Sequence, residues 1–263
     1  MRTVEASINY LGPMRERPRY HAQDHARDNL VLDPRIVTIE DMREGEAASL
    51  AREGFVLVQQ TTAAGEFRED AAQAVYAAEI ERLIMEHTGA DRVVITGKAL
   101  LRFSERAAES GMLFNSLPAR FIHIDISDPT AHEFAARSEP RPVRRFAHYN
   151  IWRVLSEPPQ DVPLTVCDAR SLTPDDLVEA DAVFDAPGAP EWAFEGLLVR
   201  YSPRHRWCYF SNMRRNEALI FKTNDSDPSE PHHIPHSAFD DPSCPPDVPP
   251  RISVEARAIA YWY

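Results

Sequence analysis

Proline interrupts this chain much more often than glycine does, and most of the prolines fall between short apolar runs. The 263 residues include 22 prolines and 9 glycines. Because proline ends helices and occupies turns, this pattern favours many strands and few long helices. Runs typical of strands lie at 54–60, 91–97, 119–127, 150–155, 163–172, 196–202, 205–211, 217–225 and 251–262. The series predicts a mainly β fold of the sandwich or barrel type.

Helical patterns are few. Residues 68–87 place apolar side chains at helical spacing and are followed by Gly89, a residue that often ends helices. A second, short helix is expected after Thr173, which can cap it with Pro174 in its first turn. We expect the polar residues 1–28 to form an irregular N-terminal arm.

The segment 226–250 is rich in proline, but one strong strand still follows it before the chain ends. That strand has to return to the core, so the segment is expected to be an active-site loop rather than a linker between domains. We therefore expect residues 1–263 to form a single domain.

Charge and cysteine content limit the partners and the compartment. Lys and Arg number 29 and Asp and Glu 41, which gives a net charge of −12. This balance argues against binding of nucleic acid or an anionic membrane surface, since both favour clustered cations. The 3 cysteines form no C-x-x-C pair, and no apolar run is long enough to span a membrane. We expect a cytoplasmic protein that acts on a small molecule.

The strongest chemical feature is His123-Ile-Asp125, within the strand-like run 119–127. Residues i and i+2 of a strand share a face, so this imidazole and this carboxylate point the same way. They can supply two ligands to a divalent metal, or they can form a plain hydrogen-bonded pair. A third ligand would come from the other histidines of the 10 in the chain. Two histidines and one carboxylate leave open positions on Fe(II) for a cosubstrate and dioxygen.

Several motifs make a family resemblance visible. NIWRVL, PLTVCDARSL, YSPRHRWCYFSNM, NEALIFKTNDS, HSAFDDP and RISVEAR resemble the successive motifs of the non-haem Fe(II)/2-oxoglutarate-dependent hydroxylases and desaturases of secondary metabolism, the AsaB, gibberellin desaturase and CmcJ-like family. The resemblance covers roughly residues 28–262. It implies a double-stranded β-helix, the cupin-like jelly roll, with flanking helices. It also implies Fe(II) as the metal, with 2-oxoglutarate and O2 as cosubstrates.

The resemblance also assigns residues. His236 becomes the third metal ligand, because it follows the strand EALIFKTND and precedes Arg251 by 15 residues. His205, His232 and His233 are its competitors, and the last two are expected in solvent.

Arg251 and Ser253 alternate onto one face of the last strand, where they would hold the far carboxylate of 2-oxoglutarate. If Arg251 does not hold this carboxylate, Arg257, which lies further along the same face, is the alternative. The alternative for Arg251 is a surface ion pair with Asp240, Asp241 or Asp247.

Two further residues are expected beside the cosubstrate or the substrate, namely Asn150 and Arg153. A structural salt bridge to Asp168 or Glu217 is the alternative. The substrate-side candidates are His205, Trp207 and Tyr209.

The chain departs from the family pattern at Val154, where W-R-P is usual, and at Cys208, where W-Y-Y-F is usual. We expect Cys208 to lie in or near the pocket wall.

The expected function is therefore hydroxylation or desaturation of a small metabolite, with succinate and CO2 as coproducts. Two other functions fit the same residues. One is a cupin-like metal-dependent hydrolase or isomerase with Zn²⁺ or Mn²⁺, and the other is a non-catalytic β-helix protein that binds a metabolite or a partner. A homodimer or a partner enzyme is compatible with the exposed strand edges of such folds.

Overall fold

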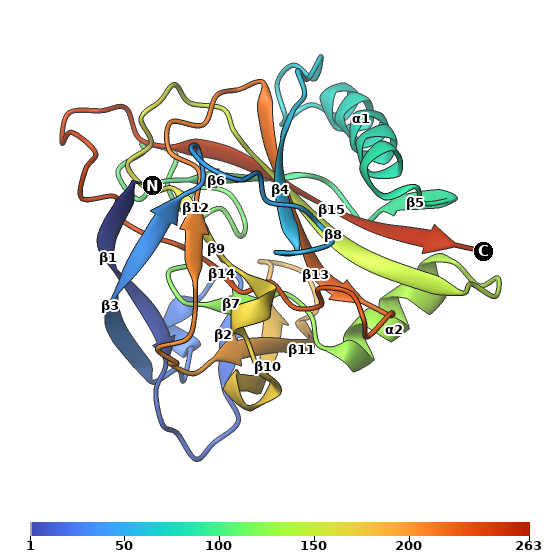
Figure 1. The fold of residues 1–263 in the computed structure, drawn as a ribbon, viewed down its shortest axis with the longest axis horizontal. Helices are drawn as coiled ribbons and strands as arrows, with labels where there is room; N and C mark the ends of the chain where they lie inside the picture. Colours follow the sequence, from blue (N-terminus) through green and yellow to red (C-terminus); the bar gives the residue numbers. More distant parts are fainter. Residues whose placement is uncertain (1) are drawn as a thin grey trace.

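Two curled sheets lie face to face in the computed structural model, which describes residues 2–263 (Figure 1). The larger sheet has nine strands, in the spatial order β1 (Thr3–Leu11), β3 (Leu32–Asp41), β12 (Trp207–Tyr209), β9 (Leu164–Cys167), β14 (His236–Ala238), β7 (His123–Ile124), β11 (Trp192–Val199), β10 (Leu177–Phe184) and β2 (Arg19–His21). The smaller sheet has six strands, in the order β4 (Phe55–Gln59), β13 (Glu217–Asp225), β8 (Arg145–Val154), β15 (Ile252–Trp262) and β5 (Arg92–Ile95), with β6 (Leu100–Phe103) also paired to β15.

Alternation along the strands creates two separate apolar layers. On β8, Ile151 belongs to the core under helix α1 (Asp70–Thr88), whereas Trp152 belongs to the core between the sheets. Because successive side chains of a strand point to opposite faces, one run of apolar residues can build both layers. The inter-sheet core also takes Val166 and Cys208 from the larger sheet.

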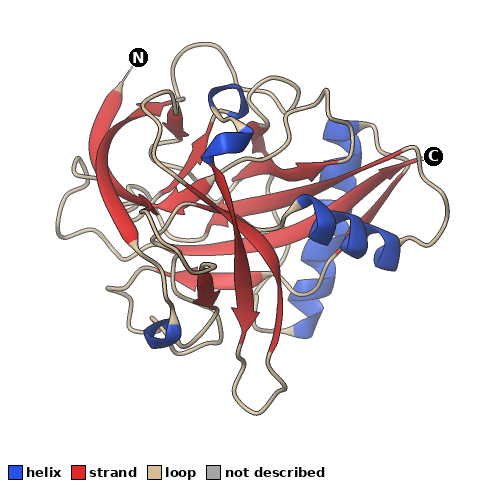
Figure 2. Cartoon of the chain, turned by 90° about the horizontal axis from the view of Figure 1, so that it is seen from below, coloured by secondary structure: helices blue, strands red, loops and turns tan. Residues whose placement is uncertain are grey.

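The two α-helices cover the sheets from outside, as Figure 2 shows in blue. Helix α1 packs on β5 and β15 and ends at Gly89, whose φ of 66° gives a left-handed cap. Helix α2 (Asp128–Ser138) is capped by the Ser127 side chain and contacts β11. Single 3-10 turns occupy His25–Arg27, Ala169–Ser171 and Pro174–Asp176. Among residues 2–263, no helix is both long and apolar enough to cross a membrane.

The mainly β prediction is confirmed, and β13 has the predicted bounds 217–225. Several local predictions were wrong. The arm 1–28 is not irregular, because Thr3–Leu11 forms β1 and pairs with β3. The helix after Thr173 is one 3-10 turn followed by strand β10. The run 119–127 forms a strand only at His123–Ile124, and α2 begins at Asp128.

A glycine allows the proline-rich segment to approach strand β4. Gly54 has a φ of 87°, and a Cβ there would collide with the Ile234 side chain and lie 3.1 Å from Cβ of Pro231. Ile234 is fully buried. The segment that leads to His236 therefore packs directly against Gly54, a position that only glycine occupies without strain.

We expect Gly54→Ala to lower the free energy of unfolding by about 2 kcal/mol. Alanine is strained at a positive φ, and its Cβ would also collide with the Ile234 side chain, so the two costs add. Chemical denaturation measures this difference. Gly65→Ala is the matched control, since a Cβ at Gly65 meets nothing within 4 Å. Equal stability of the two variants would contradict the role of Gly54.

A buried histidine connects β8 to α2 and makes stability depend on pH. His148 Nε2 donates to the carbonyl oxygen of Ala131 at 3.0 Å, and burial lowers the pKa of His148 to about 4. The unfolded chain takes up this proton near pH 6.5. Stability is therefore lost as the pH falls from about 6.5 to 4, because the unfolded state binds more protons there.

From this shift alone, we expect the unfolding free energy to decrease by about 3 kcal/mol between pH 7 and pH 4. His148→Gln keeps a side-chain donor but does not titrate, so it should remove that share of the acid sensitivity. Denaturation curves at several pH values test this. The same pH slope in both proteins would show that His148 is not responsible.

Candidate metal centre and the two cavities beside it

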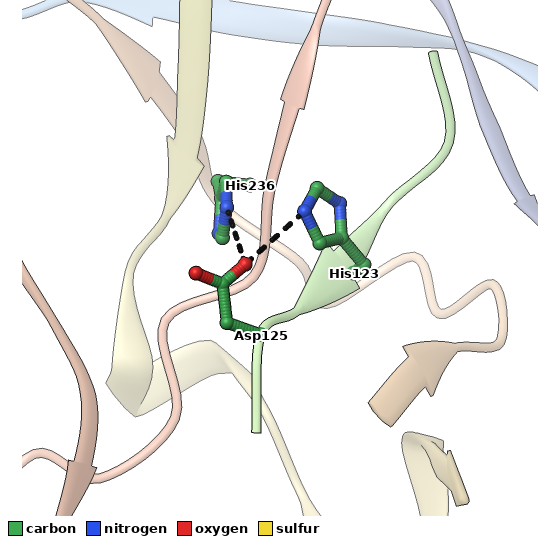
Figure 3. Close-up of side chains that lie close together, drawn as sticks. All are labelled: His123, Asp125 and His236. Carbon is green, nitrogen blue, oxygen red and sulfur yellow. Dashed lines mark ion pairs between the residues drawn. The ribbon is translucent and has the colours of Figure 1, made fainter. Parts of the chain in front are cut away.

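Strand register brings together the three predicted metal ligands. His236 on β14 pairs directly with His123 on β7, and Asp125 follows two residues after His123. Nε2 of His123 lies 3.4 Å and Nε2 of His236 lies 3.6 Å from Oδ1 of Asp125. Figure 3 shows both imidazoles directed at this one carboxylate oxygen. The three donor atoms lie within 4.8 Å of one another, which suits a single ion.

Both imidazoles are held with Nε2 free for a metal. Nδ1 of His123 contacts the carbonyl oxygen of Phe121 at 3.1 Å, and Nδ1 of His236 contacts that of Ile234 at 3.2 Å. A carbonyl only accepts, so each Nδ1 carries the proton and each Nε2 keeps its lone pair. Burial lowers the pKa of His123, and the neighbouring His236 lowers it further. A neutral imidazole is the form that binds metals.

The carboxylate is oriented by two side chains from the smaller sheet. Oδ2 of Asp125 accepts from Nδ2 of Asn150 at 2.9 Å and from Nε of Arg257 at 2.8 Å. Burial opposes ionisation of Asp125, but the Arg257 charge and the histidine contacts outweigh it and hold its pKa well below the usual range. Oδ1 therefore faces the histidines in the charged form. Asn150 and Arg257 therefore lie at the site, where both hold the Asp125 carboxylate.

A buried cation without a counter-ion lies beside the triad. Arg251 is 2% exposed, and its Nε has no hydrogen-bond partner. Its guanidinium donates to Ser253 Oγ, and no carboxylate of residues 2–263 forms an ion pair with it. Burial lowers the pKa of Arg251 to about 10. Since an unpaired buried charge is costly, this group fits an anionic ligand.

The surface ion pairs considered for Arg251 are therefore not formed. A cavity of about 40 Å³ adjoins the guanidinium and is lined by His123, His236, Trp152 and Glu255 among others.

A much larger cavity, of about 810 Å³, also reaches the triad, and His123, Asp125 and Asn150 are among its lining residues. Its outer wall is aromatic. The ring of Phe184 stacks on Trp192 at 4.6 Å between centroids and on Phe194 at 5.3 Å. His123 lines both cavities, whereas Asp125 lines only the large one and His236 only the small one.

Arg153 is not brought to this site. It lies on the face of β8 opposite to Asn150, where its guanidinium donates to the carbonyl oxygens of Gln60 and Arg215. The salt bridges to Asp168 and Glu217 do not form either, because those carboxylates pair with other arginines. Strand alternation is the reason, since Asn150 and Arg153 are an odd number of residues apart.

The three substrate-side candidates also lie outside both cavities. Nε1 of Trp207 donates to Tyr10 at 2.7 Å, Nδ1 of His205 lies 3.2 Å from the same hydroxyl, and Tyr209 packs on Phe239. Trp207 and Tyr209 face a core formed within the larger sheet. Cys208 points the opposite way, into the inter-sheet core, and does not line either cavity.

Sequence reasoning missed the aromatic wall and misplaced two histidines. Phe184 and Trp192 lie at the ends of the β10–β11 hairpin and pair with each other. In the sequence EWAF, Trp192 and Phe194 are two residues apart and so share one face of a strand, which was the sequence signal for this aromatic wall. His232 and His233 are not in solvent, because both contact Asp128 and only 30% and 10% of their side chains are exposed.

Comparisons with known proteins agree with this geometry. A family model described as "Oxidoreductase/YMDC permease-like domain" matches residues 8–261. The chain is 29% identical over 245 residues to the Fe(II)/2-oxoglutarate-dependent dioxygenase NvfI of Aspergillus novofumigatus, covering 89% of this chain and 85% of the relative. It is 29% identical over 256 residues to the hydroxylase/desaturase CTB9 of Cercospora beticola, covering 88% and 77%.

A solved structure of the iron and alpha-ketoglutarate-dependent endoperoxidase NvfI superimposes with a TM-score of 0.83 at 26% identity and covers 98% of this chain and 97% of that one. The predicted jelly roll is thereby confirmed. The chain therefore belongs to the oxidoreductase family of Fe(II)/2-oxoglutarate-dependent hydroxylases and desaturases of secondary metabolism.

Proposed function

We propose that this enzyme oxidises an apolar small molecule by hydroxylation or desaturation, with His123, Asp125 and His236 as its iron ligands. 2-Oxoglutarate is the cosubstrate and is converted to succinate and CO2. The observation that carries the proposal is the convergence of two imidazoles and one carboxylate beside a buried arginine without a counter-ion. This combination suits a metal and an anionic cosubstrate together.

The donor set fits the metal of the family. Fe(II) bound by two histidines and one carboxylate keeps open positions and supplies the activation of dioxygen. The chain's own residues prepare this site. The carbonyls of Phe121 and Ile234 fix the tautomers, and Asn150 and Arg257 direct one carboxylate oxygen toward the histidines.

Arg251 and Ser253 would hold the distal carboxylate of 2-oxoglutarate. The guanidinium presents a buried donor without a protein acceptor, and the hydroxyl lies in contact with it. A carboxylate there would satisfy the donor and neutralise the charge. The two cavities share Arg102, Pro118, Ala119 and His123 in their linings, so a cosubstrate and a substrate can meet at the triad.

The large cavity would bind and position the substrate. Its volume of about 810 Å³ accommodates a drug-sized molecule. Phe134, Phe184 and Phe194 offer apolar faces that exclude water from the reacting end. Substrate orientation is the chain's main contribution to the outcome of the oxidation.

Anaerobic titration with Fe(II) and then 2-oxoglutarate tests the proposed function without a substrate. We expect a weak visible charge-transfer band in the wild type, because the keto acid can use positions that the triad leaves open. His236→Ala should abolish the band, whereas the surface control His87→Ala should retain it. Iron binding without a band would instead favour a hydrolase, an isomerase or a non-catalytic binding protein.

Arg251→Ala should raise the 2-oxoglutarate concentration that gives half of the band by about 10-fold to 100-fold, because a charge-assisted contact is lost. Fe(II) affinity should stay unchanged, since Arg251 does not contact the triad. Arg137→Ala is the matched control, because its side chain is 66% exposed yet lines the large cavity. An unchanged 2-oxoglutarate requirement in Arg251→Ala would move the carboxylate-binding role to Arg257.

We also propose one catalytic domain in a reducing, cytoplasmic compartment, without a nucleic-acid or membrane partner. Cys167 and Cys208 are buried free thiols and Cys244 is also unpaired. Burial raises the pKa of Cys167 to about 12, so that thiol stays protonated and unreactive. The acidic net charge of −12 supports the absence of a nucleic-acid partner. A homodimer or a partner enzyme would cover the edge strands β1 and β2.

A further inference from the structure

A second cluster of potential metal ligands lies outside the proposed iron site. Nε2 of His232 lies 2.9 Å and Nε2 of His233 lies 3.1 Å from the same oxygen, Oδ1 of Asp128. The two histidines belong to the loop between β13 and β14, and Asp128 is the first residue of α2. Figure 1 shows this red loop beside α2.

The arrangement overloads one carboxylate oxygen. Besides the two imidazoles, Nδ2 of Asn224 donates to Oδ1 of Asp128 at 2.7 Å. A carboxylate oxygen offers two lone pairs, yet three donors converge on this one. Two neighbouring histidines both turn their Nε2 atoms to a single point, which is the geometry of a chelating pair.

The spacing is close to that of a bound transition metal. Zn²⁺ binds imidazole nitrogen and carboxylate oxygen at about 2.0–2.1 Å, so a tetrahedral site separates its ligand atoms by roughly 3.3 Å. The contacts of 2.9 and 3.1 Å would have to lengthen by only a few tenths of an ångström. The Asp128 side chain is 57% exposed, which leaves access for the ion and for a water ligand.

We propose that Asp128, His232 and His233 form a second divalent-metal site that binds Zn²⁺. Two imidazoles and one carboxylate bind Zn²⁺ more tightly than Fe²⁺ in the general order of divalent metals. This assignment stands on its own geometry and does not depend on the proposed iron ligands. A bound ion would replace the two imidazole contacts to Asp128 by three coordinate bonds and leave the Asn224 hydrogen bond in place.

The position of this site gives it a structural role. Asp128 comes three residues after Asp125, and His233 comes three residues before His236. An ion between them would cross-link the two chain segments that carry the iron ligands. It would also fix the loop segment that packs over Gly54, because Ile234 follows His233 directly.

Counting bound Zn²⁺ on the full-length apo-protein tests the proposal, by calorimetry and by metal analysis after gel filtration. The wild type should bind two equivalents, since the proposed iron site also accepts Zn²⁺. His233→Ala and Asp128→Asn should each bind one equivalent. His87→Ala, which removes an exposed histidine of α1, should still bind two.

The variants separate the two sites. His236→Ala should lose the Zn²⁺ of the proposed iron site and keep the Zn²⁺ of the second site. If His236→Ala retains two equivalents, the proposed iron site fails while the second site stands. If the wild type binds one equivalent and His233→Ala keeps it, or if His233→Ala still binds two, the second site is wrong and the cluster is a plain hydrogen-bonded network. The equivalent that remains in each variant shows that the protein is folded.

Amide hydrogen exchange supplies a readout that does not depend on counting. Zn²⁺ should slow exchange in residues 226–235 of the wild type and of His236→Ala, because the ion ties this loop to α2. The same addition should leave these amides unchanged in His233→Ala. If Zn²⁺ slows amide exchange in His233→Ala as much as in the wild type, the ion does not cross-link this loop to α2.

Discussion

The proposed metal centre depends on the cross-strand pairing of His123 with His236. These residues are 113 positions apart in the sequence, and only the register of β7 against β14 places them opposite each other. A shift of one residue in that register would turn one imidazole to the other face of the sheet. The carbonyls that fix the imidazole tautomers belong to the same two segments, so the pairing sets both the position of the two rings and the nitrogen that each presents to Asp125.

Strand β15 supplies the charges that complement this centre. From Arg251, just before its start, every second residue faces the interior, and this row contains Ser253, Glu255 and Arg257. One end of the row meets the small cavity and the other end holds the carboxylate ligand. The two arginines differ in one respect, since Arg257 is neutralised by Asp125 and Glu255 whereas Arg251 has no ion pair among the described residues. That difference supports the proposal that Arg251 binds the anionic cosubstrate.

Local patterns predicted the parts of the fold that short-range rules control. The alternation in FIHIDIS gave the shared face of His123 and Asp125, and helix α1 followed from its spacing and its terminal glycine. The position of Arg153 depended on which face of β8 turns to the cavity, which is a tertiary property. Trp207 and Tyr209 were misplaced for the same reason, because β12 has apolar layers on both sides and its sequence does not distinguish them. Strand β1 alternates in burial but was obscured by its polar outer residues.

The two proposed histidine ligands lie on two of the shortest strands, since β7 has 2 residues and β14 has 3. The partners of Asp125 lie on β8 and β15, which have 10 and 11 residues and pair along their whole length. Short strands have few ladder hydrogen bonds and open by local fluctuations, whereas long central strands open only with the whole protein. A local opening of β7 and β14 would therefore separate the proposed histidine ligands while the smaller sheet keeps the partners of Asp125 in place. Loss of a metal from the proposed site would then not require global unfolding.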